Sequence, residues 1–235
     1  MTMLAYHNDP AVKDKYIARM RSHMEADALI QGKGWDGYKG CAVGCTFETY
    51  DHSCGPVEIG VPEPLVRLED AIFEGLPEDQ AKGFPLAFLE AIQVGADLSL
   101  AWPRFAVWLL SDPQFGVLRH CNDATRPSVE TVIGLYHRWI DGDQPSDEEF
   151  EVARAAAWAA RETEAARAAA ETAWAAAWAA AGAAEAASWA AAGAAQSAAW
   201  AAAEAASWAA KEGFWIAARD ELLRLLSQAP VAAEA

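Results

Sequence analysis

Positive charge is scarce in this sequence. Its 235 residues include 18 lysines and arginines against 34 aspartates and glutamates, so the formal net charge is −16. Nucleic-acid backbones and anionic lipid surfaces repel such a chain unless basic residues cluster, and the sequence contains no basic cluster. We therefore expect no direct nucleic-acid or membrane partner, whereas a basic protein partner suits an acidic surface.

Long apolar runs are missing as well. No apolar run follows a basic stretch near the start, so we expect no cleaved secretory signal. The alanine- and tryptophan-rich stretch 174–210 contains no Leu, Ile or Val, and polar residues such as Glu185 and Glu204 interrupt it, which argues against a transmembrane helix. We expect a soluble, cytoplasmic protein, in which the four cysteines are thiols or metal ligands rather than disulfides.

Proline and glycine positions predict an all-α fold. Pro10, Pro103 and Pro127 each stand where a helix begins, since proline suits the first helical turn. Strand signals are limited to TFETY and VEIGV, which we expect to form no more than a small hairpin beside the cysteines. Residues 1–145 are therefore predicted to be a compact helical domain, with helices over residues 10–30, 64–76, 79–94, 102–110 and 127–141.

A second region is predicted to begin after the linker DGDQPSDEEF. Ser146 and Glu149 form a capping box there, which marks the start of a helix. Alanine has the highest helix propensity, so we expect a long helix or a helical hairpin over residues 146–228, which ends after Leu226, and a tail over 229–235.

The alanine-rich region contains a short repeat. Trp178, Trp189 and Trp200 are spaced by eleven residues, which is close to three helical turns. On a helical projection of residues 174–210, every tryptophan and polar side chain falls on one side, and the opposite arc of about 140° holds alanine alone. Such a face suits close helix packing, and tryptophan is a common anchor at protein interfaces.

Three functions remain open for this region. The first is an arm for self-association or partner binding. In the second, the region packs on its own domain, and in the third it is a spacer. The partner-binding candidates are Trp174, Trp178, Trp189, Trp200 and Trp208.

The densest chemistry lies in CAVGCTFETYDHSC, residues 41–54. Three thiolates and one imidazole are a permitted tetrahedral zinc set, although the spacing between the first two cysteines is wider than in zinc knuckles. A radical-type iron–sulfur signature is excluded, because Glu48 stands where its third cysteine is required. The sequence thus leaves two possibilities: no cofactor, or a single zinc ion. The candidate ligands are Cys41, Cys45, His52 and Cys54.

Two alternatives to a metal site stay open. Cys41 could be a nucleophile at a helix N-terminus near Lys39, with His52 as base and Asp51 or Glu58 as the orienting acid. The cysteines could instead be buried core residues.

Three further acids lie on the helix predicted over residues 64–76. Glu69, Asp70 and Glu74 are expected to form a solvated face of that helix, the ordinary place for such charges.

Three stretches, KGCAVGCTF, LVRLEDAIFEGLP and FLEAIQVGADLS, resemble a group of uncharacterised open reading frames of bacteria and their phages. The resemblance covers residues 5–112 and implies a prokaryotic or phage origin, with Cys41, Cys45 and His52 as the residues of interest. It implies no activity, and the C-terminal part varies in that group.

These observations favour a non-enzymatic, acidic interaction or oligomerisation protein. For a phage product, a host defence factor is a conceivable target by analogy. A cysteine-dependent hydrolase or transferase that uses Cys41 and His52 is one alternative, and a structural spacer is another.

Overall fold

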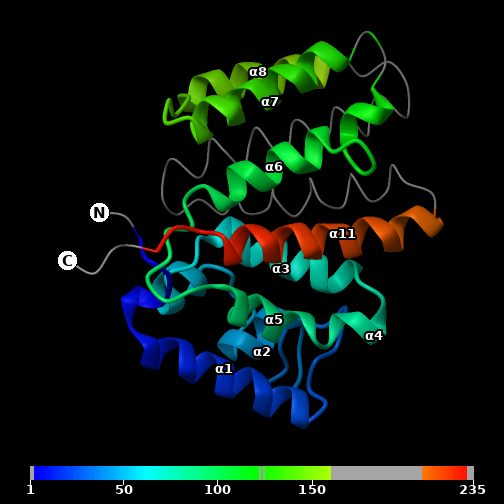
Figure 1. Cartoon of the computed structure of the whole chain (residues 1–235). Helices are drawn as coiled ribbons and strands as arrows, with labels where there is room; N and C mark the ends of the chain where they lie inside the picture. Colours follow the sequence, from blue (N-terminus) through cyan, green and yellow to red (C-terminus); the bar gives the residue numbers. More distant parts are fainter. Residues whose placement is uncertain (1–2, 122, 124, 160–207, 232–235) are drawn as a thin grey trace. The chain divides into compact units, whose positions relative to one another are not determined.

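The computed structural model describes residues 3–121, 123, 125–159 and 208–231, and their regular elements are helices (Figure 1). Only isolated β-bridges, such as Leu4 with Asp97, lie outside them in these ranges. The predicted all-α fold is confirmed. None of the helices in the described ranges is long and apolar enough to span a membrane.

The chain divides into two compact units. The first unit comprises the residues up to Ala101 together with those from Ala218 onward, and the second runs from Trp102 to Ala217. This division differs from the predicted boundary near residue 145. The difference arises because the C-terminal end of the chain returns to the N-terminal part: Leu222 and Leu226 are buried, and Asp97 N–H donates to the Pro230 carbonyl at 2.8 Å.

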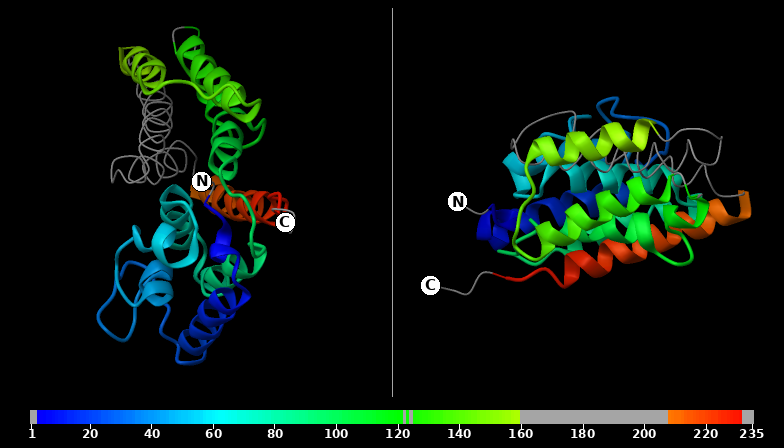
Figure 2. Two further views of the ribbon diagram at one scale, coloured as in Figure 1. Left: turned by 90° about the vertical axis from the view of Figure 1, so that its left-hand side faces the viewer. Right: turned by 90° about the horizontal axis from the view of Figure 1, so that it is seen from above.

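The first unit is a cluster of short helices. Helix α1 packs on α5 and α2, and α2 packs on α3 (Figures 1 and 2). The elements are η1 (Ala5–Asn8), α1 (Pro10–Glu25), α2 (Ala42–Phe47), the π-helix η2 (Gly55–Ile59), α3 (Glu63–Gly75), α4 (Glu78–Ala81), α5 (Phe84–Ala91) and the C-terminal half of α11 (Trp208–Ser227).

Local sequence signals account for most of these helix ends. Asp9 caps α1 by accepting a hydrogen bond from Ala11 N–H at 2.9 Å, and Pro10 fills the first turn. Helix α1 ends five residues before the predicted Ile30, because Asp27 adopts a left-handed conformation (φ 48°). The helix predicted over 79–94 is divided into α4 and α5 around Gly83.

The predicted hairpin beside the cysteines is wrong. TFETY begins inside α2, which ends at Glu48 in a left-handed conformation (φ 57°). Most of VEIGV lies in η2, which ends at Gly60, also left-handed (φ 62°). A Cβ atom at Gly60 would lie 2.2 Å from the Leu4 carbonyl oxygen, so this turn is set by close contact with a distant segment.

The second unit contains α6 (Ala101–Ser111, from its second residue), η3 (Val117–His120), α7 (Arg126–Ile140), α8 (Asp147–Ala159) and the N-terminal half of α11. Helix α7 packs on α8. The predicted capping box is confirmed, because Ser146 N–H donates to Glu149 Oε2 at 2.8 Å and Glu149 N–H donates to Ser146 Oγ at 3.3 Å. The predicted helix end is also confirmed, since α11 ends at Ser227.

Most of the predicted tryptophan arm falls outside the described residues. This applies to four of the five partner-binding candidates, Trp174, Trp178, Trp189 and Trp200. Trp208 is the first residue of α11.

Candidate functional site

Two glycines bring Cys41 into the core of the first unit. A Cβ atom at Gly40 or Gly44 would lie 2.1 or 2.2 Å from the Gly34 carbonyl oxygen, so only glycine allows the loop to lie against the start of α2. In that arrangement Cys41 N–H donates to the Gly34 carbonyl at 3.0 Å. Cys41 caps α2, where Sγ accepts a hydrogen bond from Gly44 N–H at 3.5 Å.

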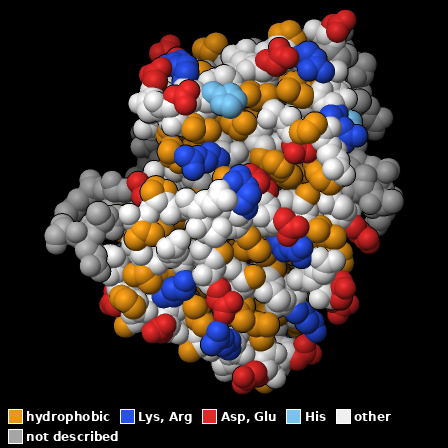
Figure 3. Space-filling view, viewed as in Figure 1, with side chains coloured by type: hydrophobic (Ala, Val, Ile, Leu, Met, Phe, Trp, Pro, Cys, Tyr) orange, Lys and Arg blue, Asp and Glu red, His pale blue; other side chains and the backbone are white. Residues whose placement is uncertain are grey.

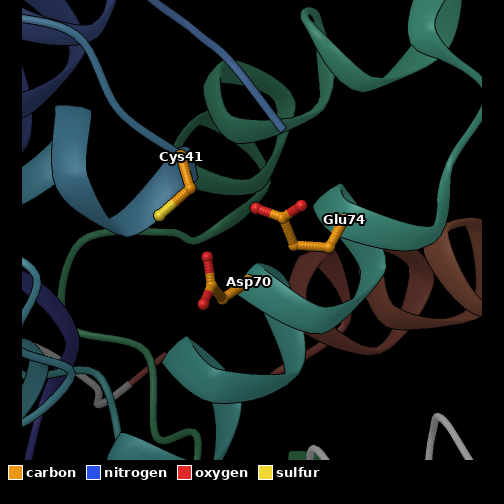
Figure 4. Close-up of side chains that lie close together, drawn as sticks. All are labelled: Cys41, Asp70 and Glu74. Carbon is orange, nitrogen blue, oxygen red and sulfur yellow. The ribbon is translucent and has the colours of Figure 1, made fainter. Parts of the chain in front are cut away.

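The Cys41 thiol faces two carboxylates from α3. Sγ of Cys41 and one oxygen each of Asp70 and Glu74 all lie within 4.8 Å of one another (Figure 4). Asp70 and Glu74 are four residues apart on a helix, so their side chains project from the same face. Cys41 and Asp70 are buried, and Glu74 is partly exposed.

Asp70 is the central residue of this cluster. Its Oδ2 atom lies 3.0 Å from His52 Nε2 and accepts a hydrogen bond from the Tyr50 hydroxyl at 3.2 Å. Its Oδ1 atom is buried and has no hydrogen-bond partner. Across the described residues, neither Asp70 nor Glu74 forms an ion pair with a lysine or arginine. The cluster therefore holds an acceptor that lacks a partner, which is costly in a protein interior.

Burial favours the protonated forms of Cys41 and Glu74. Burial, and next to it the negative charge of Asp70, raises the pKa of the Cys41 thiol. Burial also raises the pKa of Glu74, although a hydrogen bond from Gly32 N–H counteracts this. The pKa of Glu69, next to Asp70 in sequence, is raised well above its usual value by burial and by Asp70. A divalent cation would displace such protons and satisfy the carboxylates.

The structure does not group the predicted zinc ligands together. In the part of the chain that it describes, the one cluster of potential ligand atoms contains Cys41 with Asp70 and Glu74, without Cys45, His52 or Cys54. The reason is local geometry. Cys45 Sγ points to the Ala28 and Gly40 carbonyls, at 3.7 and 3.5 Å, and His52 contacts Asp70. Burial is the main reason why the pKa values of the Cys45 and Cys54 thiols are raised to about 11.

The geometry of the predicted catalytic set does not suit a thiol nucleophile. Cys41 is 1% exposed, and its raised pKa disfavours the reactive thiolate. Asp51 does not orient His52, because its Oδ1 accepts hydrogen bonds from Ser53 N–H and Ser53 Oγ at 2.9 and 2.7 Å. His52 interacts with Asp70 instead.

The expectation that the acids of α3 face water is wrong for two of them. Glu69 is 2% exposed and Asp70 is 1% exposed. The sequence contains a signal for this, because Asp70 stands between Val66 and Phe73 at the i, i+4, i+7 spacing of an apolar helix face. Sequence reasoning therefore missed Asp70 and Glu74 as candidate ligands.

The chain matches no protein-family model, no curated protein and no solved structure. One face of the molecule carries charges of both signs (Figure 3). Acidic and basic side chains are interspersed there, without a continuous basic area (Figure 3). The candidate function consequently depends on the chemistry of the cluster itself.

Proposed function

We propose that this protein binds a zinc ion through Cys41, Asp70 and Glu74. The observation that carries the proposal is the buried Asp70 Oδ1 atom, which lacks a partner in a cluster whose ligand atoms lie within 4.8 Å of one another. Ligand atoms on a tetrahedral zinc ion lie roughly 3.5 Å apart. Side-chain rotations that move the ligand atoms by about 1 Å would therefore close the site around the ion.

The mixed ligand set favours zinc over the common alternatives. A thiolate selects zinc over magnesium or calcium, which prefer oxygen ligands alone. His52, which contacts Asp70 Oδ2, would orient its carboxylate as outer-shell partners do in metal sites. Three protein ligands also leave a fourth position for water or another small ligand. The four cysteines are free, which supports a reducing, cytoplasmic location.

Metal binding to the full chain tests this proposal. We expect the purified protein to bind one equivalent of zinc, and cobalt in its place to give a thiolate charge-transfer band in the near ultraviolet. Cys41→Ser should abolish the band, whereas Cys45→Ser and Cys54→Ser should retain it. Loss of binding in the Cys45 and Cys54 variants would favour the ligand set predicted from sequence, and absence of binding by the wild type would refute both.

We infer a second function, self-association, from the sequence of the alanine-rich region. The observation that favours it is the repeat of Trp178, Trp189 and Trp200 opposite an alanine-only face. A surface of methyl groups lets two helices approach closely, and the indole rings would flank the contact.

Light scattering on the full chain tests self-association. We expect a mass above the 25.2 kDa of one chain, and a return toward that mass when Trp178, Trp189 and Trp200 are all replaced by alanine. A monomeric wild-type protein would exclude this function. The cobalt spectrum of the same variant provides the control, because the zinc site lies in a different part of the chain.

A further inference from the structure

Tyr50 connects the buried cluster with solvent. Half of the residue is exposed, at 50%, yet its hydroxyl group donates a hydrogen bond to Oδ2 of Asp70, which is 1% exposed. One side chain therefore extends from the protein surface to the buried carboxylate of Asp70.

Contacts on two sides hold the Tyr50 ring beside Asp70. One is with His52, whose ring lies edge-on to it at a centroid distance of 5.0 Å. The other is with Gly34: a Cβ atom there would lie 2.9 Å from Tyr50 Cγ, so the ring takes this position because residue 34 has no side chain. Tyr50 itself belongs to a segment without regular structure, which follows the left-handed Glu48 at the end of α2.

The same loop that carries Gly34 also contacts the outer ligand of the cluster. Gly32 N–H donates a hydrogen bond to Glu74 Oε2 at 2.6 Å, and Glu74 is the one partly exposed member of the cluster. The loop around Gly32 and Gly34 thus contacts both the Tyr50 ring and the one partly exposed member of the cluster. Cys41 and Asp70, in contrast, are covered by protein.

We propose that Tyr50 is a lid that controls the exchange of the metal ion with solvent. The proposal rests on the zinc site described above and adds a property to it: the ion enters and leaves when the Tyr50 ring swings outward. That movement breaks the hydrogen bond to Asp70 and the contacts with His52 and Gly34, and it requires no change in a helix. A single movable side chain at the entrance suits an ion that exchanges with solvent.

Zinc release from the full chain to an excess of a chromogenic chelator, followed by stopped flow, tests the lid. We expect Tyr50→Ala to accelerate both release and uptake roughly tenfold, as loss of a hydrogen bond and of ring packing would do. The equilibrium affinity should change much less than either rate. Tyr50→Phe keeps the ring and should have a smaller effect on both rates.

Gly34→Ala offers an independent route to the same result, because the added methyl group would lie 2.9 Å from Tyr50 Cγ and would displace the ring from its present position. We expect it to accelerate release as Tyr50→Ala does. Gly83→Ala is the matched control, since a Cβ atom at Gly83 meets nothing within 4 Å, and Tyr38→Ala removes an exposed tyrosine outside the cluster.

The outcomes separate the lid from the metal site. If the wild type binds zinc and Tyr50→Ala changes release and uptake less than about twofold, the lid proposal is overturned while the zinc site stands. A lower affinity with unchanged uptake would also overturn it, because Tyr50 would then act only by orienting Asp70. If the wild type binds no zinc, the proposed function itself fails.

Discussion

Replacing Asp70 by asparagine should lower the affinity for zinc by at least about 100-fold. Asparagine has the same shape and can still accept the hydrogen bond from the Tyr50 hydroxyl, but it loses the charge of the central ligand. Loss of outer-shell partners alone typically costs 10- to 100-fold in metal affinity, so the loss of a ligand should exceed that range. A competition titration against a chelator of known affinity measures the change.

Asp79→Asn is the matched control for this substitution. Asp79 lies in α4 and is exposed, so it shares the chemistry of Asp70 without its surroundings. We expect the affinity of this variant to equal that of the wild type. If Asp70→Asn and Asp79→Asn bind zinc equally well, Asp70 is not a ligand.

Replacing Glu69 by glutamine should make the metal-free protein more stable above neutral pH. Glu69 is 2% exposed, its Oε1 atom has no hydrogen-bond partner, and burial raises its pKa well above the usual value. The folded protein therefore holds a proton that the unfolded chain releases near pH 4.3. As the pH rises from about 4.3 to the pKa of Glu69 in the folded protein, the free energy of unfolding falls by about 1.4 kcal/mol per pH unit. Below about pH 4.3, Glu69 contributes no pH dependence.

Denaturant unfolding at a series of pH values, with a chelator present, checks this effect. Glutamine cannot ionise, so Glu69→Gln should lose this part of the pH dependence and resemble the wild type only at acidic pH. Glu78→Gln, on an exposed position of α4, should leave the wild-type slope unchanged. Identical slopes for the wild type and Glu69→Gln would show that Glu69 is not the group that titrates.

Helix positions were largely predictable from the sequence, since the signals at helix ends are local. Pro10 after Asp9, and Ser146 with Glu149, act through their own neighbours, and the structure shows both caps. The segment from Cys41 to Gly60 was not predictable in this way. Its turns depend on contacts with distant segments, such as that of Gly60 with Leu4, which no local pattern reveals.

The candidate site was predictable only in part. The sequence points to Cys41 as a candidate site residue. The residues near it in sequence, Cys45, His52 and Cys54, are not the ones that lie beside its thiol in the cluster, which are Asp70 and Glu74. Charged residues on helices usually face water, so the sequence alone favours solvent-exposed positions for Glu69 and Asp70. Their positions in apolar series, Val66–Asp70–Phe73 and Leu65–Glu69–Ile72, indicate burial, and an acid in such a series is the sequence signal to seek.

The return of α11 to the first unit makes residues 102–217 an insertion within that unit. On the ribosome, where N-terminal segments usually fold first, the early helices therefore emerge long before Leu222 and Leu226, which complete their apolar packing. Until those leucines are synthesised, the first unit lacks two of its buried apolar side chains, and such incomplete apolar packing favours chaperone binding or aggregation. Its maturation thus waits for synthesis of the whole alanine-rich tract, whatever role that tract has afterwards.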